Sequence, residues 1–117
     1  MGKLTTHVLD TAHGCPGAGI RLRLYADDKG EPLLISEAET NEDGRCDEPL
    51  LSGTRLRPGR YMIAFEVGDY FRRRGVALPE PAFLETVRIA FGIADAGAHY
   101  HVPLLVSPFA YSTYRGS

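Results

Sequence analysis

The sequence is short of the features that mark several large classes of protein. Its 117 residues include only two cysteines, Cys15 and Cys46, too few for the disulfide framework of a small secreted domain. No apolar stretch approaches the roughly 18 residues of a membrane span, and no signal peptide opens the chain. With 13 Lys and Arg against 15 Asp and Glu, the net charge of −2 gives no electrostatic basis for binding nucleic acid. These absences predict a cytoplasmic chain with two free thiols that binds neither membranes nor nucleic acids.

Several common catalytic motifs are missing as well. Ser107 and Ser112 do not lie in the Gly-x-Ser-x-Gly turn that presents a serine nucleophile. Neither cysteine has a neighbourhood that marks it as a reactive thiolate. No glycine-rich phosphate loop follows a strand. The sequence therefore offers no motif for a covalent nucleophile or for a bound nucleotide.

The dominant pattern in the chain is an apolar residue at every second position, which is typical of half-buried strands. Residues 4–10 are also rich in strand-forming residues, and Gly, Pro and Asp turns separate these segments. The one convincing helix runs from about Asp69, its expected N-cap, to Arg74, with Gly75 ending it. Residues 1–117 are thus predicted to form a single domain, a two-sheet β-sandwich of seven or eight strands with one short helix. The alternating sets are Ile20, Leu22, Leu24 and Ala26; Tyr61, Ile63, Phe65 and Val67; and Val87, Ile89, Phe91 and Ile93.

The last nineteen residues, 99–117, are unusual for a chain end because they are apolar and aromatic almost throughout. A segment so rich in strand formers is expected to pair into a sheet. Pro103 is the exception, because a proline donates no ladder hydrogen bond and favours edges or bulges. Alternation in His99-Tyr100-His101 places both imidazoles on one face of a strand.

The histidines are the main candidates for chemistry. His99 and His101 have a spacing compatible with metal ligands, and with His7 they could form a three-imidazole zinc site. No carboxylate or thiolate has a matching spacing, and His-x-His is common in strands, so ordinary sheet histidines are the favoured interpretation. His13 lies in a loop with glycine and proline and is expected to do nothing specific. Arg45 follows an Asp-Gly turn, where a surface charge is the simplest interpretation.

Three segments together carry a resemblance to a known family. Thr6-His7-Val8-Leu9-Asp10-Thr11, then Asp43-Gly44-Arg45 after Thr40-Asn41, and the whole tail from His99 resemble the 5-hydroxyisourate hydrolases, the enzymatic branch of the transthyretin-like family. The resemblance covers essentially the full chain. Its most specific motif is the closing Tyr114-Arg115-Gly116-Ser117, because the hormone-carrying transthyretins end differently.

The resemblance implies a transthyretin-like sandwich of eight strands and one helix, assembled as a homotetramer with active sites between dimers. It places His7, Arg45 and His101 at catalytic positions, and Tyr114, Arg115, Gly116 and Ser117 at the substrate. In such an assembly His7 and His101 would need no partner within one subunit.

The implied reaction is hydrolysis of 5-hydroxyisourate without a metal or other cofactor. Imidazoles suit this chemistry because their ordinary pKa of about 6.5 lets them exchange protons near neutrality. The sequence leaves two alternatives: a non-catalytic carrier of a small aromatic ligand on the same sandwich, and a zinc-binding sandwich.

Overall fold

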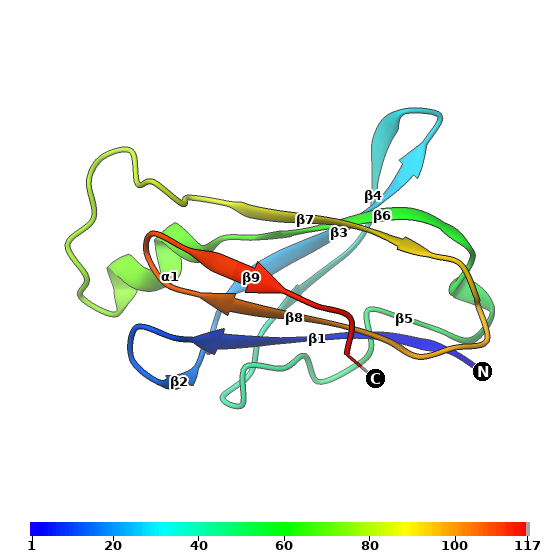
Figure 1. Ribbon diagram of the computed structural model, residues 1–117, viewed down its shortest axis with the longest axis horizontal. Helices are drawn as coiled ribbons and strands as arrows, with labels where there is room; N and C mark the ends of the chain where they lie inside the picture. The colour runs from blue at the N-terminus through cyan, green and yellow to red at the C-terminus, as the bar shows by residue number, and fades with distance from the viewer. Residues whose placement is uncertain (117) are drawn as a thin grey trace.

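The computed structural model describes residues 1–116, which form two β-sheets packed face to face (Figure 1). The prediction of a mainly-β sandwich with one α-helix is confirmed, with nine strands instead of about eight because two are only two residues long. The strands are β1 (Lys3–Asp10), β2 (Cys15–Pro16), β3 (Arg21–Asp28), β4 (Glu31–Glu39), β5 (Leu51–Ser52), β6 (Gly59–Phe65), β7 (Val87–Ile93), β8 (Tyr100–Val106) and β9 (Tyr111–Thr113). The helices are α1 (Val67–Arg73) and a short 3₁₀ turn, η1 (Gly53–Arg55).

The first strand and the tail of the chain lie side by side in one sheet. Its strand order is β2-β1-β8-β9, with β5 also paired to β1, whereas the second sheet has the order β4-β3-β6-β7. β1 and β8 run parallel from Leu4 opposite Tyr100 to Asp10 opposite Val106, the blue and orange strands of Figure 1. The prediction that the tail pairs into a sheet is therefore confirmed.

Alternation divides β1 between the core and the outer face of its sheet. Leu4, Thr6, Val8 and Asp10 are buried, and the residues between them are only partly covered. Strand side chains point to opposite faces in turn, so the outer face of β1 presents Thr5 and His7. Larger apolar side chains from both sheets fill the space between the layers, as expected for a sandwich. The fully buried ones include Leu22, Leu24, Ile63, Phe65, Val87, Leu104 and Val106.

Helix α1 begins earlier than predicted. Val67 is its first residue and not the last position of a strand, because Val67, Tyr70 and Phe71 form a buried helical face at i, i+3 and i+4. The prediction that Asp69 is the N-cap is wrong, since Asp69 lies inside the first turn and Glu66 precedes the helix. Gly75 follows the last turn with φ +83°, as expected for a helix stop. No helix within residues 1–116 combines the length and apolarity needed to cross a membrane.

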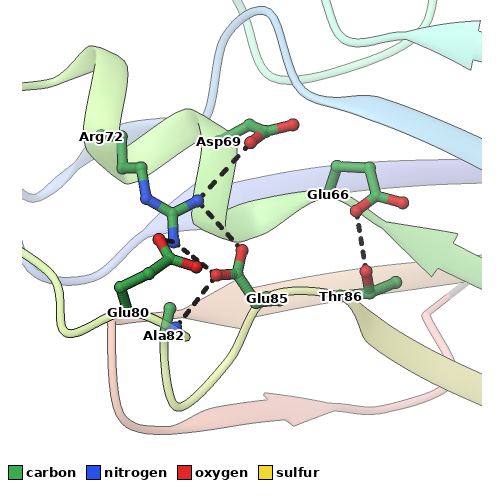
Figure 2. Close-up of polar contacts among 7 residues, drawn as sticks. All are labelled: Glu66, Asp69, Arg72, Glu80, Ala82, Glu85 and Thr86. Atoms are coloured by element: carbon green, nitrogen blue, oxygen red, sulfur yellow. Dashed lines mark hydrogen bonds and ion pairs between the residues drawn. The ribbon is translucent and has the colours of Figure 1, made fainter.

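The arginines of α1 anchor the helix to neighbouring segments. Arg72 forms ion pairs with the carboxylate of Glu85, and Asp69 and Glu80 lie at 3.6 and 3.5 Å from its guanidinium (Figure 2). Arg73 donates a hydrogen bond to the Gly19 carbonyl at 2.6 Å. Arg72 and Arg73 are thus engaged within the chain, whereas the sequence alone favours a solvated helix face for the basic run 72–74.

Pro103 lies in β8, an interior strand, although proline usually favours an edge strand or a bulge. It pairs with His7 of β1 on one side. On the other side, pairing of β8 with β9 ends at Leu104 and resumes only at a single bridge between His101 and Gly116. The proline therefore occupies a gap in the ladder, where its missing N–H costs no strand pairing.

His13 contacts a buried carboxylate, so the expectation that it does nothing specific is wrong. Its Nδ1 lies 2.6 Å from Oδ2 of Asp10, a carboxylate with no exposed surface. The Tyr70 hydroxyl donates to the same oxygen at 2.7 Å, and the backbone N–H groups of Ala12 and His13 donate to Oδ1 at 3.0 Å. We refer to Asp10, His13 and Tyr70 as the Asp10 cluster. It ties the end of β1 to α1.

Candidate functional site

A broad cavity of about 930 Å³ opens on the outer face of the sheet that contains β1 and β8. It draws together residues from the start, the middle and the end of the chain. Both charged side chains among its described lining residues are arginines, so the cavity favours an electron-rich or anionic ligand. Its lining consists of Thr5, His7, Arg45, His99, His101, Tyr114, Arg115 and Gly116.

The two predicted catalytic histidines face each other in this cavity. The ring centroids of His7 and His101 lie 6.4 Å apart with the planes inclined by 30°. His7 projects from β1 and His101 from β8, two neighbouring strands whose outer faces are continuous. Both rings therefore lie within reach of one ligand bound in the cavity.

His101 is held by two neighbours within its own chain. The hydroxyl Oγ1 of Thr5 lies 2.8 Å from its Nδ1, and the Gly116 N–H donates to its backbone carbonyl at 2.7 Å. Gly116 lies so close that a Cβ there would approach the ring carbon Cδ2 to 2.8 Å, so only glycine fits. The implication that the histidines need no partner within one subunit is therefore wrong for His101.

A tight turn delivers Arg45 to the same cavity. Gly44, with φ +75°, allows the chain to reverse, and its carbonyl accepts a hydrogen bond from Val8 N–H at 2.8 Å. The Asn41 side chain accepts hydrogen bonds from the N–H groups of Asp43 and Arg45, at 2.9 and 3.1 Å. Arg45 then forms an antiparallel bridge with His7. The arginine is thus placed against His7 by local hydrogen bonding and is not merely a surface charge.

Burial and the nearby arginine keep both histidines neutral. Burial, followed by the charge of Arg45, lowers the pKa of His7, against an opposing hydrogen bond with the Asp43 backbone. Burial, Arg45 and His7 likewise lower the pKa of His101. A positive charge beside an imidazole disfavours its protonated form, and partial burial acts in the same direction. Both rings are therefore poised to act as neutral groups near pH 7.

The tail forms one wall of the cavity. Tyr114 is 61% exposed, so its phenol is available to a ligand. The Arg115 guanidinium stacks over the Tyr100 ring, 4.2 Å from its centroid, and donates to the His99 carbonyl at 3.1 Å. These contacts hold the end of the described chain against β8. Ser117, also predicted at the substrate, lies outside the described residues.

The three histidines considered for zinc line the cavity, but they do not gather as a ligand set. Within residues 1–116, no group of three or more His, Cys, Asp or Glu side chains is arranged to hold a metal ion.

Cys15 and Cys46 are both free thiols. Burial, together with the neighbouring Asp47, raises the pKa of Cys46. A raised pKa is the opposite of what a thiolate nucleophile requires.

Sequence reasoning overlooked Thr5 as a member of this site. A signal for it existed, because a residue two places before His7 in a strand must share its outer face. The parallel register that sets Thr5 opposite His101 could not be inferred from local sequence. We refer to Thr5, His7, Arg45 and His101 as the imidazole site.

The fold and the site define a transthyretin-type sandwich with a polar cavity on one sheet, and comparison with known proteins gives the family. Residues 4–116 match the model of the HIUase/Transthyretin family, and the chain belongs to it. A curated relative from Pseudomonas aeruginosa, named 5-hydroxyisourate hydrolase, is 62% identical over all of this chain and 93% of its own.

Solved structures agree with this assignment. A crystal structure of (S)-allantoin synthase superimposes with a TM-score of 0.93 at 44% identity, over 99% of this chain and 44% of that longer one. The structure of Klebsiella pneumoniae 5-hydroxyisourate hydrolase matches over the full length of both chains, with a TM-score of 0.80 and 32% identity. Sea bream transthyretin, at 24% identity and a TM-score of 0.87 over 97% of this chain and 94% of its own, shares the fold.

Proposed function

We propose that this chain is a 5-hydroxyisourate hydrolase that converts its substrate to 2-oxo-4-hydroxy-4-carboxy-5-ureidoimidazoline in urate degradation. The observation that carries the proposal is the pair of imidazoles 6.4 Å apart, kept neutral beside Arg45. The printed names of the Pseudomonas and Klebsiella relatives support the choice of substrate.

The reaction adds water to a ring carbonyl and opens the adjacent carbon–nitrogen bond. It needs a base for the water, stabilisation of the developing oxyanion and a proton for the leaving nitrogen. We assign the base to His7 and place His101 across the substrate from it. Arg45 keeps the imidazoles neutral and can bind the urate-like ring through its planar donor fork. Tyr114 contacts the substrate, while Arg115, Gly116 and Ser117 complete the wall, and no metal or cofactor takes part.

We further propose that residues 1–117 act as one domain in a homotetramer, with the sites between dimers. The cavity is broad and open in the single chain, and a facing subunit would enclose it and exclude water. Pairing would also cover the exposed edge of β9, where Tyr111 is 46% exposed. A cytoplasmic location remains a prediction, supported by the two free thiols.

The test is to generate 5-hydroxyisourate with urate oxidase and follow its ultraviolet decay with and without this protein. We expect the protein to accelerate the decay at pH 7. Binding of 5-hydroxyisourate or another aromatic ligand without acceleration would instead favour the non-catalytic carrier. Light scattering on the same preparation should give the mass of four chains.

A further inference from the structure

Thr5 contacts a reactive group of the imidazole site, yet it has no assigned role. It lies directly opposite His101 in the parallel register of β1 and β8, on the same outer face as His7. Its Oγ1 is 2.8 Å from Nδ1 of His101. Within residues 1–116 this is the one hydrogen bond of the Thr5 hydroxyl, and neither ring nitrogen of His101 has another partner.

A contact of this kind selects one tautomer of a neutral imidazole. If the hydroxyl donates to Nδ1, the ring proton resides on Nε2 and points away from β1 into the cavity. If Nδ1 carries the proton instead, the hydroxyl must accept it, and its own proton then has no acceptor in the described chain. The first arrangement gives the hydroxyl proton an acceptor and leaves one donor, Nε2–H, facing the cavity, where a bound ligand can accept it.

We propose that Thr5 is a positioning residue that holds His101 in its Nε2–H tautomer, so that His101 serves as a neutral hydrogen-bond donor to the oxyanion. This inference rests on the proposed function for the identity of the oxyanion. A neutral imidazole that carries its one proton on Nε2 cannot act as a second base there, and losing that proton would leave an unfavourable anion. His101 therefore keeps its proton throughout and stabilises charge.

The proton balance then closes on His7. A free nitrogen of His7 takes a proton from water as the new carbon–oxygen bond forms at the ring carbonyl. The imidazolium of His7 returns that proton to the leaving nitrogen as the carbon–nitrogen bond breaks, so His7 ends the cycle neutral. His7 suits this role because its ring lines the cavity, and burial and the charge of Arg45 lower its pKa so that it starts the cycle neutral.

The first experiment reads the tautomer directly and needs no substrate. Nitrogen NMR of protein labelled with ¹⁵N-histidine, at pH 8, should show His101 protonated at Nε2 and bare at Nδ1. A His101→Gln variant assigns the resonances. In Thr5→Val, which keeps the side-chain shape but removes the hydroxyl, we expect a mixture of tautomers, and in Thr5→Ser the wild-type pattern. A wild-type His101 protonated at Nδ1 would overturn the proposal.

The second experiment measures catalysis by the same variants. Loss of one positioned hydrogen bond in Thr5→Val should lower kcat about tenfold with little change in KM, and Thr5→Ser should recover most of it. Thr6→Val is the matched control: Thr6 donates to the Val102 carbonyl at 2.7 Å on the buried face, so its loss should lower Tm but spare the tautomer. Wild-type kcat in Thr5→Val would contradict the proposal. The predicted tautomer without any acceleration of 5-hydroxyisourate decay would contradict only the proposed function.

Discussion

Strand β1 carries a polar cluster on each face, and the two clusters differ in what they leave unpaired. On the inner face, both carboxylate oxygens of Asp10 are occupied by donors from Tyr70, His13 and the backbone. On the outer face, the hydroxyl of Thr5 contacts one ring nitrogen of His101. Within the described residues, no other side chain forms a hydrogen bond with a ring nitrogen of the imidazole site. The Asp10 cluster, whose carboxylate oxygens are all hydrogen-bonded, is suited to stabilising the fold. The imidazole site, which keeps ring nitrogens without a partner in the described chain, can bind and act on a ligand.

The pKa shifts of the two clusters reflect the same difference. Burial by itself would raise the pKa of Asp10, but the hydrogen bonds from Tyr70 and His13 outweigh it and the pKa is lowered. At the imidazole site burial and the charge of Arg45 act together, and both histidine pKa values fall. Asp10 is thus held in its ionised form by its partners, while the two histidines are held in their neutral form.

Removing either imidazole should have the largest effect on activity. We expect His7→Ala and His101→Ala each to lower turnover by roughly 10²–10⁴-fold, the usual scale for a lost acid–base or charge-stabilising group. The melting temperature should change little, because both side chains lie on the outer face. His99→Ala, which removes a third imidazole that lines the cavity but no group assigned to the chemistry, is the comparison. Near-normal turnover in both variants would remove the histidines from the mechanism.

Breaking the Asp10 cluster should lower stability and leave activity nearly unchanged. Asp10→Ala removes the acceptor of the buried Tyr70 hydroxyl and of two backbone N–H groups, so the free energy of unfolding should fall by roughly 3 kcal/mol. Turnover per folded molecule should stay near wild type. Asp28→Ala, at an exposed carboxylate, should change stability by less than about 0.5 kcal/mol. Denaturant unfolding measures the stability of both variants. Equal stability of the two would show that the hydrogen bonds of Asp10 contribute nothing to the free energy of unfolding.

Two substitutions of Arg45 separate the effect of its charge on the histidine pKa values from the effect of its planar shape on substrate binding. Arg45→Gln removes a charge that lowers both histidine pKa values, so the acid limb of the pH–rate profile should move to higher pH. Arg45→Lys keeps the charge but loses the planar fork, so the limb should stay in place while turnover falls. Arg55→Gln, an exposed arginine, is the control. An unmoved limb in Arg45→Gln would mean that burial alone keeps the imidazoles neutral.

Metal removal should have no effect. Dialysis against a strong chelator is expected to leave turnover and Tm unchanged, because proton transfer by imidazoles needs no Lewis acid. Protein purified without a metal-affinity tag gives the cleanest comparison. Activity that is lost on chelation and restored by zinc would make His99 and His101 ligands and replace the mechanism.

Local sequence predicted those parts of the fold that have a regular period. β3, β6 and β7 follow from alternation, and β1 follows from its content of strand-forming residues. β4 does not follow from either, because its register against β3 shifts between Leu24 and Tyr25 and two neighbouring residues, Leu33 and Leu34, are both exposed. Likewise, the helix start was misplaced because Val67 fits both a strand and a helical face.

The candidate site was predictable only in part, because its residues are far apart in the sequence. His7, Arg45 and His101 came from a family resemblance, since nothing local indicates that positions 7, 45 and 101 meet. The contact of Thr5 with His101 depends on the register of β1 with β8, and the contact of Asp10 with Tyr70 depends on the packing of α1; both are long-range features.

The pH dependence of 5-hydroxyisourate decay tests the central claim, that neutral imidazoles perform the chemistry. Because both histidine pKa values lie below their ordinary value of 6.5, the catalysed rate should not rise between pH 7 and 6.5, and the midpoint of its acid limb should lie below pH 6.5. The measurement is the decay with protein minus the decay in buffer at each pH. A catalysed rate that rises as the pH falls through this range would mean that protonated imidazoles act, and would contradict the account.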